Sequence, residues 1–328
     1  MTDVPPLPDE PDITRLTIAN GPVRLSLMSL GATVTELRMD GFAHSLILGS
    51  PDLAPYRDTF RYFGAIVGPV ANRIDKSMAP LGDATLHLTP NEGNNALHGG
   101  PAGLSTRNWN LADHGGNFAA FTYTWPNGDS GYPGPIHAKV TYTLEDNGAL
   151  RIDLAGTAEA RTHFNPAFHG YWSLDGSGAL TDHRLQINAA HYLPVDDDAI
   201  PKGDPAPVAG TPFDFRELTN IAADSQIDHN YCLDGVGFRE VMRMETDTLA
   251  LVIESDAPGL QVYDAARLDT SPDASHDGAP HGPYAGIALE PQIWPDAPNH
   301  PSYPSTTLRP SDTFRQTSRF RLILKETS

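Results

Sequence analysis

The stretch "VTYTLEDNGALRIDLAG", residues 140–156, indicates the fold more clearly than any other part of the sequence. Apolar side chains alternate with polar ones over residues 140–144, and the alternation resumes over residues 150–154. A period of two is typical of a β-strand with one buried face. The dipeptide Asn147-Gly148 between the two runs predicts a β-hairpin with a type I′ turn, whose two central residues both need a positive φ.

The same alternation recurs along the chain. Asn20-Gly21 marks a second hairpin, between runs 14–19 and 22–39, and further strands are predicted at 118–125, 249–255, 260–265 and 318–324. We find no long stretch with the apolar spacing and capping residues of a helix, and 29 glycines and 30 prolines are spread throughout. These features predict an all-β fold of short antiparallel strands, either a sandwich or a barrel. Residues 1–328 are expected to form a single domain, with a long surface loop at 267–283.

Charge and cysteine content narrow the function classes. With 22 basic and 41 acidic residues the net charge is −19, which argues against nucleic acid or an anionic membrane surface as a partner. The single cysteine, Cys232, rules out an intrachain disulfide and fits a reducing compartment. The start, "MTDVPPLPDEPDITR", is unlike a secretory signal, and no apolar run approaches the roughly 18 residues of a membrane span. A cytoplasmic protein is expected.

Two histidines lie in unusual local settings. His98, in "NEGNNALHGG", is followed by Gly99-Gly100, which leave open space beside the imidazole; the alternative is a hairpin turn with an incidental histidine. His169, in "HFNPAFHGYWSLDG", is surrounded by aromatic residues that favour either a sugar-stacking site or a core. A structural core histidine is therefore the alternative for His169.

Arg73 and Asp228 are two further candidates. Arg73, in "GPVANRID", carries a fixed fork of donors that suits paired hydroxyls or a carboxylate, and the alternative is a surface salt bridge with Asp75. Asp228, in "DSQIDHNYCL", stands beside His229 and Asn230, and a polar turn is the alternative there.

A glutamate stands immediately before a proline-rich segment. In "ALEPQIWPDAPNHPSYPS", residues 288–305, Glu290 ends a short apolar run and is followed by five prolines, beginning with Pro291. Proline locks φ and removes a backbone donor. The segment is therefore predicted to be rigid and to be neither helix nor central strand, with Glu290 held at a strand end.

Motifs for metals and cofactors are missing from the sequence. Three histidines and a carboxylate could form a cupin-like metal site, but we find no His-x-His, His-Glu-x-x-His or Cys-x-x-Cys spacing. There is also no dinucleotide fingerprint, phosphate loop or Gly-x-Ser-x-Gly elbow. We therefore expect no metal and no cofactor.

Seven segments, in order along the chain, resemble the aldose 1-epimerase family, also called the galactose mutarotases. They cover most of the sequence: 68–74, 91–100, 169–176, 192–215, 227–233, 258–263 and 288–301. The resemblance implies a large antiparallel β-sandwich, of the galactose mutarotase-like supersandwich type. It also implies an enzyme that interconverts the α and β anomers of a free aldose, a small-molecule monosaccharide, without a cofactor.

The resemblance implies a role for each candidate residue as well. Glu290 matches the family's general base and His169 its general acid. The positions that match sugar-binding residues are Arg73, His98, Asp228, Asn72 and Gln261. Mutarotation removes a proton from the anomeric hydroxyl while the ring oxygen is protonated. A carboxylate suits the first task, and an imidazole, with an unperturbed pKa of about 6.5, suits the second.

Three positions depart from the family's pattern. Phe168 replaces an asparagine, Tyr263-Asp264-Ala265 replaces a Tyr-Thr-Gly-Asn type stretch, and Trp294 stands where phenylalanine is common. These changes are expected near the pocket, where they would affect sugar preference.

Two alternative functions stay open, as does the oligomeric state. One is a sugar-binding protein of the same fold without catalysis, which would need no acid and base. The other is a mutarotase-like enzyme for a phosphorylated sugar, which would need clustered basic residues. The matched segments contain only Arg73 and Lys202 as basic residues.

Overall fold

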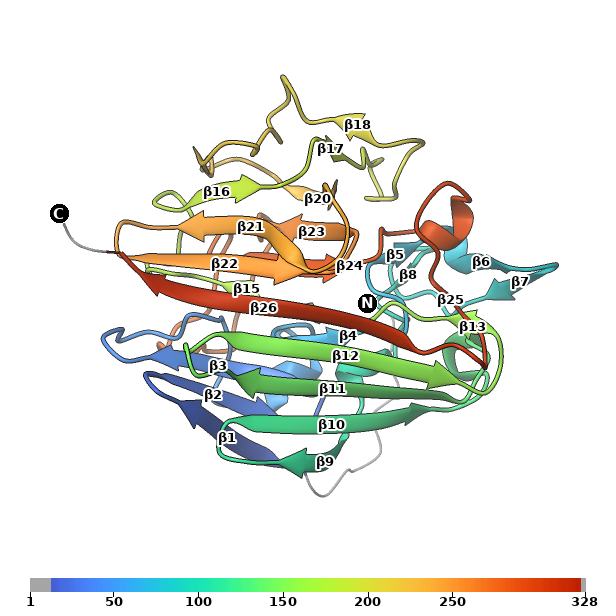
Figure 1. Cartoon of the computed structure of the whole chain (residues 1–328), viewed down its shortest axis with the longest axis horizontal. Coiled ribbons are helices and arrows are strands. Elements are labelled where there is room, and N and C mark those ends of the chain that lie inside the picture. Colours follow the sequence, from blue (N-terminus) through green and yellow to red (C-terminus); the bar gives the residue numbers. More distant parts are fainter. Residues whose placement is uncertain (1–12, 326–328) are drawn as a thin grey trace.

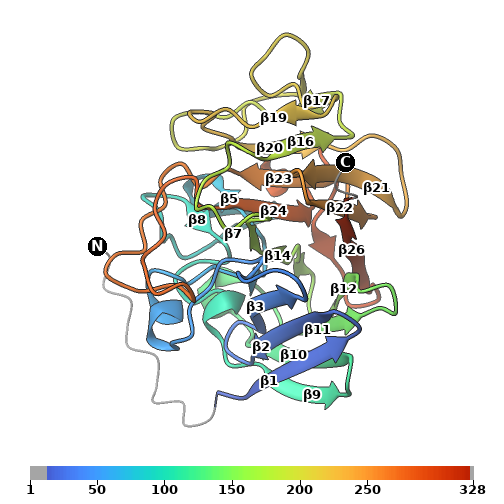
Figure 2. The same cartoon turned by 90° about the vertical axis from the view of Figure 1, so that its left-hand side faces the viewer.

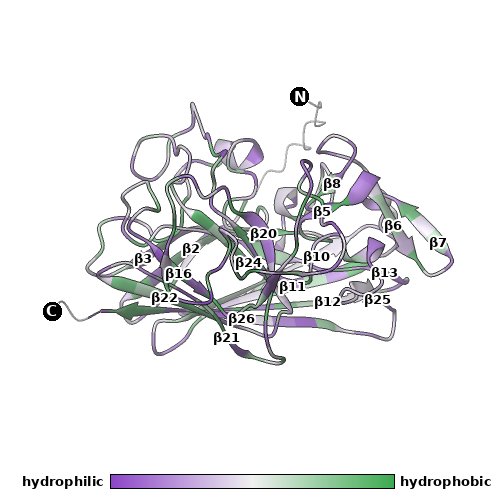
Figure 3. Cartoon of the chain, turned by 90° about the horizontal axis from the view of Figure 1, so that it is seen from above, coloured by the Kyte–Doolittle hydropathy of each residue, from purple (hydrophilic) through white to green (hydrophobic). Residues whose placement is uncertain are grey.

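Two large antiparallel sheets dominate the computed structural model, which describes residues 13–325. A nine-stranded sheet crosses the front of Figure 1, and the view from above in Figure 3 shows a six-stranded sheet and a three-stranded sheet lying over one of its faces. The only helices among these residues are short 3₁₀ turns, so the predicted all-β sandwich is confirmed. The acidic, proline-rich start falls almost entirely on residues 1–12, outside the described part of the chain.

The nine-stranded sheet has the order β19 (Thr219–Asn220), β16 (Arg184–Ile187), β21 (Arg239–Glu245), β22 (Leu249–Ser255), β26 (Phe314–Leu324), β12 (Leu150–Ala158), β11 (Ile136–Leu144), β10 (Phe118–Trp125) and β9 (Asn110–His114). The six-stranded sheet has the order β15 (Tyr171–Trp172), β24 (Ile287–Gln292), β23 (Gly259–Tyr263), β20 (Asp228–Cys232), β17 (His191–Tyr192) and β18 (Ala206–Pro207). The three-stranded sheet is β1 (Arg15–Asn20), β2 (Val23–Met28) and β3 (Thr33–Met39).

Four small two-stranded sheets complete the architecture. They are β14 (Ala167–His169) with β4 (Ala65–Val67), β5 (Arg73–Ile74) with β8 (Ala96–Leu97), β6 (Met78–Leu81) with β7 (Ala84–His87), and β13 (Thr162–His163) with β25 (Thr307–Leu308). The 3₁₀ turns are η1 (Ala54–Arg57), η2 (Asp75–Ser77), η3 (Leu104–Thr106), η4 (Asp129–Gly131) and η5 (Ala297–Asn299). Figures 1 and 2 both place β5 and β8 beside β23 and β24.

The opening stretch forms the predicted hairpin, β11 and β12, with Leu144 opposite Leu150. Its turn differs from the prediction, because Gly148 has a positive φ of 77° and Asn147 does not. The Gly148 amide donates to the carbonyl of Glu145 at 2.8 Å, which closes a four-residue turn one step earlier in the chain. A single left-handed glycine after such a turn is typical of a longer hairpin loop with a bulge rather than of a type I′ turn.

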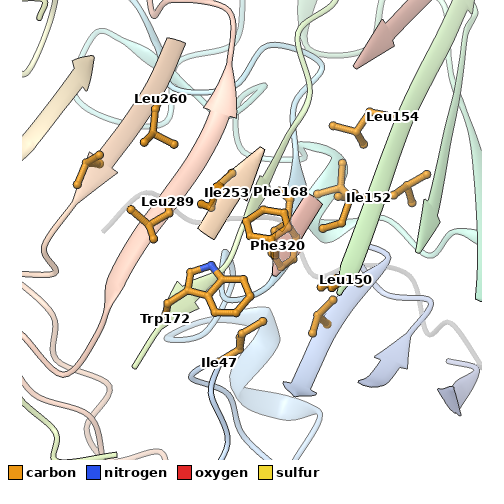
Figure 4. Packing of buried hydrophobic residues seen from close by; sticks show 14 of the residues in the cluster. Ile47, Leu150, Ile152, Leu154, Phe168, Trp172, Ile253, Leu260, Leu289 and Phe320 are labelled. Atoms are coloured by element: carbon orange, nitrogen blue, oxygen red, sulfur yellow. The ribbon is translucent and has the colours of Figure 1, made fainter. Parts of the chain in front are cut away.

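The main core lies between the two large sheets. Figure 4 shows Leu260, Leu289 and Trp172 of the six-stranded sheet gathered with Ile253 and Phe320 of the nine-stranded sheet. The rings of Trp172 and Phe320 stack with centroids 5.2 Å apart. Because side chains alternate along a strand, burying Leu260 and Leu289 here turns their neighbours to the opposite face of the sheet.

Pro291 corrects one expectation about the proline-rich segment. It lies inside strand β24, opposite Leu260 of β23, so this part of the segment is strand. The other neighbour, β15, pairs only with Ile287 and Ala288. At Pro291 the strand therefore has a paired neighbour on one side only, which is where a sheet tolerates a missing donor. Beyond Gln292 the segment contains no strand, but it does contain the 3₁₀ turn η5, contrary to the prediction of no helix. Glu290 lies inside β24, two residues before its last residue, rather than at the strand end.

Residues 267–283 form the predicted loop, which contains no helix or strand. His276 donates from Nε2 to the carbonyl of Thr35 at 2.9 Å, and the Thr59 hydroxyl donates to Asp273 at 2.7 Å. These contacts fasten the middle of the loop to the body of the protein. No helix within residues 13–325 is long and apolar enough to cross a membrane.

Candidate active site

One pocket of about 670 Å³ collects six of the seven predicted site residues. Those that line it are Asn72, Arg73, His98, His169, Asp228 and Glu290. Gln261 lies just behind the lining, and its Nε2 donates to Asp228 Oδ1 at 2.7 Å. Segments separated by more than 200 residues in the sequence therefore meet at one place.

The register of three strands explains why Asp228, Gln261 and Glu290 lie together. Gln261 on β23 is opposite Glu290 on β24 and, on its other side, opposite Asn230 on β20. Asp228 lies two residues before Asn230, so it shares the same face of the sheet. This face is the one turned away from the Leu260 and Leu289 core, and it forms a wall of the pocket.

His169 and Glu290 form a buried pair at the pocket's inner end. His169 Nε2 lies 3.4 Å from Glu290 Oε1, and the two residues are 5% and 1% exposed. Burial lowers the pKa of His169 to about 4 and raises the pKa of Glu290 well above its usual range, because both charged forms lose hydration. The charge of Asp228 raises the pKa of Glu290 further, while Arg73 opposes the shift.

His98 is held by Asn72 through the backbone. The His98 amide donates to the Asn72 carbonyl at 2.9 Å, and the Asn72 amide donates to His98 Nδ1 at 3.0 Å. Because Nδ1 accepts, the proton of the neutral ring is on Nε2. Both residues have a positive φ, 60° and 51°, which is uncommon for residues other than glycine and is often associated with functional sites. Burial, followed by the charges of His169 and Arg73, lowers the pKa of His98 well below its usual value.

Arg73 lies between two carboxylates. Its Nε donates to Glu92 Oε2 at 2.6 Å and its Nη2 to Glu92 Oε1 at 3.0 Å, while Nη1 is 3.6 Å from Asp228 Oδ2. Burial alone would lower the pKa of Arg73, but Glu92 and Asp228 outweigh it and the pKa is raised. Burial also raises the pKa of Asp228, against the effects of Arg73 and Gln261. The salt bridge with Asp75, considered from the sequence, is absent from the ion pairs of the described residues, where Asp75 pairs with Lys76.

Several residues of the pocket were not predicted as site residues from the sequence. The ring of Tyr62 lies 4.8 Å from that of His98, and Tyr171 lies 5.1 Å from His169. Glu92 and Arg267 also line the pocket. Glu92 falls inside a segment that resembles the family, but only its contact with Arg73 distinguishes it from an ordinary surface carboxylate.

Two of the three departures from the family's pattern lie outside the pocket lining. Phe168 alternates with His169 on β14, so it points into the core, where its ring lies 5.8 Å from that of Phe320. Trp294 donates to the carbonyl of Pro258 at 2.9 Å and packs on Tyr303. Only the stretch that begins with Tyr263-Asp264 contributes to the lining. The expected effect of Phe168 and Trp294 on sugar preference therefore has no direct contact to support it.

Asp264 connects the backbone segments around residues 225–227 and 264–266 at the pocket's edge. It accepts hydrogen bonds from the Ser225 hydroxyl and the Ile227 amide, each at 2.7 Å, and from the Ala266 amide at 3.1 Å. Within residues 13–325, no group of three or more His, Cys, Asp or Glu side chains is arranged to hold a metal ion.

Comparison with known proteins agrees with the fold. The family model described as aldose 1-epimerase matches residues 14–321. Human galactose mutarotase is 35% identical over 315 residues, which cover 91% of each chain. Aldose 1-epimerase of Escherichia coli K12 is 33% identical and covers 96% of this chain and 97% of its own.

Solved structures show the same relationship. A GalM/aldose epimerase homologue from C. elegans superposes with a TM-score of 0.90 at 28% identity, covering 96% of this chain and 100% of its own. Galactose 1-epimerase from Lactobacillus acidophilus gives 0.85 at 26% identity, with 98% and 97% covered. A shared fold and named relatives over nearly the whole length define an enzyme of the isomerase class. Within that class the chain belongs to the aldose 1-epimerase family, as its sequence segments indicated.

Proposed function

We propose that the protein interconverts the α and β anomers of an uncharged free aldose, with Glu290 and His169 moving the protons. The observation that carries the proposal is the buried pair, with His169 Nε2 3.4 Å from Glu290 Oε1 inside a pocket large enough for a monosaccharide. An acid and a base in reach of one another and of one ligand are what ring opening requires.

The pair holds one proton in its active form. Burial disfavours both imidazolium and carboxylate, so in the empty pocket the proton resides on Glu290 and the imidazole is neutral. The short Nε2 to Oε1 gap allows the proton to pass to His169, which leaves Glu290 ionised. Arg73 supports this form, since its charge lowers the pKa of Glu290.

Ring opening then follows from this charge arrangement. Glu290 takes the proton of the O1 hydroxyl, the bond between C1 and the ring oxygen breaks, and His169 gives its proton to that oxygen. The product is the open-chain aldehyde. The proton of the pair now lies on Glu290 instead of His169, so the enzyme gains and loses no proton. Rotation about the C1 to C2 bond and reclosure by the reverse transfers give the other anomer. Glu290 Oε2 has no hydrogen-bond partner within residues 13–325, so it is free to accept from the sugar.

The surrounding polar groups serve binding. Nε2–H of His98 is a neutral donor, and Asp228 is an acceptor whose orientation Gln261 secures. Asn72 keeps His98 in place through its backbone, while Arg73 completes the polar lining with Nη1. Fixing a sugar against a prearranged acid and base lowers the cost of reaching the reactive geometry.

An uncharged sugar suits this pocket better than a phosphorylated one. Asp228, Glu290 and Glu92 all line it, Arg73 is already paired, and Arg267 is the one other arginine or lysine of the lining in the described part of the chain. A phosphate site needs unpaired basic side chains in a cluster. A sugar-binding protein without catalysis is also less consistent, because burying a titratable pair costs stability that binding alone does not require.

Polarimetry tests the proposal directly. Freshly dissolved α-D-glucose and α-D-galactose should reach their equilibrium rotation faster with the protein than in buffer, and the rate should be proportional to enzyme concentration. A panel that adds xylose, arabinose and fucose identifies the preferred aldose. An unchanged rate for every sugar would reject catalysis.

A cytoplasmic location stays a prediction that rests on the single cysteine, the start of the sequence and the lack of a long apolar run. A single domain likewise stays a prediction.

A further inference from the structure

Glu92 occupies the donor fork of Arg73, an arginine that lines the pocket. Two guanidinium nitrogens of Arg73, Nε and Nη2, donate to its two carboxylate oxygens at 2.6 and 3.0 Å. This is the bidentate geometry by which arginine ordinarily recognises a carboxylate or phosphate of a ligand. The protein's own side chain therefore fills the position that an anionic ligand would take.

The backbone of Glu92 is fixed in the position that allows this contact. Its amide donates to the Asn95 carbonyl at 3.1 Å, and the Asn95 amide donates back to the Glu92 carbonyl at 2.9 Å. Asn95 is itself buried, and its side-chain oxygen accepts from the Lys76 amide at 2.9 Å. The Glu92 side chain, by contrast, is 39% exposed and lines the pocket, so it is accessible to a ligand there.

The two carboxylates beside Arg73 offset its attraction for an anion, and Arg267 is the other arginine of the pocket lining. Arg73 has Glu92 on one side and Asp228 on the other, at 3.6 Å from Nη1, so the three side chains together carry one negative charge when ionised. Without Glu92 the fork would be free and the local charge would be neutral. A carboxylate brought in by a sugar could then take both donors, as Glu92 does now.

We propose that Glu92 is a specificity-determining residue, which restricts the pocket to uncharged aldoses by filling the Arg73 fork with a carboxylate of the protein itself. The inference rests on the proposed function and names the substrate class of that site. Glu92 would select the substrate without touching the reacting atoms. Glu92 acts through Arg73, so it is a positioning residue rather than a catalytic one.

The test compares an uncharged aldose with its acidic counterpart. D-Galactose and D-galacturonate differ at C6, where the second carries a carboxylate at neutral pH. The ratio of kcat/KM for galacturonate to kcat/KM for galactose is measured by polarimetry for the wild type, Glu92→Gln and Glu92→Ala. We expect the ratio to rise about tenfold or more in both variants, the change that 1.4 kcal/mol represents.

A matched control disrupts a bidentate arginine–carboxylate pair of the same geometry elsewhere in the protein. Arg151 donates from Nε and Nη2 to Asp153 at 2.7 and 2.9 Å on strand β12, away from the pocket lining. Asp153→Asn should leave the ratio unchanged. A role of Glu92 limited to stability would lower both activities together and leave the ratio at the wild-type value, and that result would overturn the proposal. Melting temperatures confirm that each variant is folded.

A second variant shows whether Arg73 carries the effect. Adding Arg73→Ala to Glu92→Ala should abolish any gain for galacturonate, and a gain that persists would mean that Arg73 is not responsible. If the wild type has no activity on any sugar, the proposed function fails, and calorimetric binding of galacturonate still decides the present question. Tighter binding by Glu92→Gln than by the wild type supports it, and equal or weaker binding rejects it.

Discussion

Gln261 holds Asp228 from outside the pocket lining, through a 2.7 Å hydrogen bond from its amide to Oδ1. The other oxygen, Oδ2, faces Arg73 at 3.6 Å. Asp228 therefore has one oxygen secured by a neutral donor and the other directed towards a cation. Since Gln261 is also opposite Glu290 in the sheet, a single residue of β23 lies between the carboxylates of Asp228 and Glu290.

Replacing Asp228 should weaken sugar binding more than it slows the chemistry. For Asp228→Ala and Arg73→Ala we expect KM to rise by about tenfold or more with a smaller change in kcat, since each loses a charged partner of the ligand. Gln261→Ala should raise KM less, because it only releases Asp228. Steady-state polarimetry measures both constants. An unchanged KM in Asp228→Ala and Arg73→Ala would remove both residues from the binding site.

Replacing either member of the buried pair should reduce kcat strongly. Glu290→Gln and His169→Asn each remove a proton-transfer group while keeping a similar shape, and we expect kcat to fall by at least about 10². Melting temperature and circular dichroism serve as the folding control. Near-normal turnover in Glu290→Gln would show that another group takes the O1 proton.

The pH dependence of kcat/KM should report the proton shared by the pair. Below the His169 pKa of about 4 both groups are protonated and no base remains, so activity should fall there. At high pH the pair loses its proton and no acid remains; burial moves that alkaline limb upwards, because it raises the pKa of Glu290. Initial rates over a wide pH range test this. An acid limb near pH 6.5 would show that His169 titrates as an exposed imidazole does.

Glu290→Gln should stabilise the protein, and more so at high pH. The folded-state pKa of Glu290 is raised by burial, so the folded state keeps a proton that the unfolded chain releases above its ordinary pKa. The stability that this bound proton contributes to the wild type is therefore lost progressively as pH rises from the ordinary pKa of the unfolded chain through the pKa of the folded state. Glutamine has no such dependence. Melting temperatures at pH 5 and pH 8 should show a larger gain for Glu290→Gln at pH 8, and an equal gain at both would contradict the raised pKa.

Restoring the family's asparagine at position 168 should destabilise this protein rather than change its sugar preference. Phe168 is 3% exposed and packs on Tyr142 and Phe320, so Phe168→Asn leaves a cavity and buries an amide. We expect a loss of about 3 kcal/mol or more, from the range for large-to-small changes of a core phenylalanine. Denaturant unfolding measures it, with Phe168→Leu as the milder control. A loss below about 1 kcal/mol would show that the core accommodates the amide.

The local sequence predicted the strands well and their connections less well. Alternating runs correctly located β10, β11, β12, β22 and β26, because a period of two is a property of neighbouring residues. The turn at Gly148 was predicted with the wrong type, since its form depends on where the strands stop pairing. Pro291 was excluded from a central strand, yet it lies in β24 because the neighbour β15 ends before reaching it.

The sequence by itself determined the residue types of the site and the family they belong to. His98, His169, Arg73, Asp228 and Glu290 could be named from their segments, because motifs are local. Only the tertiary structure decided which of them touch. The fork between Arg73 and Glu92, the position of Gln261 behind Asp228 and the burial of Phe168 away from the pocket all depend on strand register and packing across long separations in the chain. Such distances are set when sheets assemble, and no short stretch of sequence contains them.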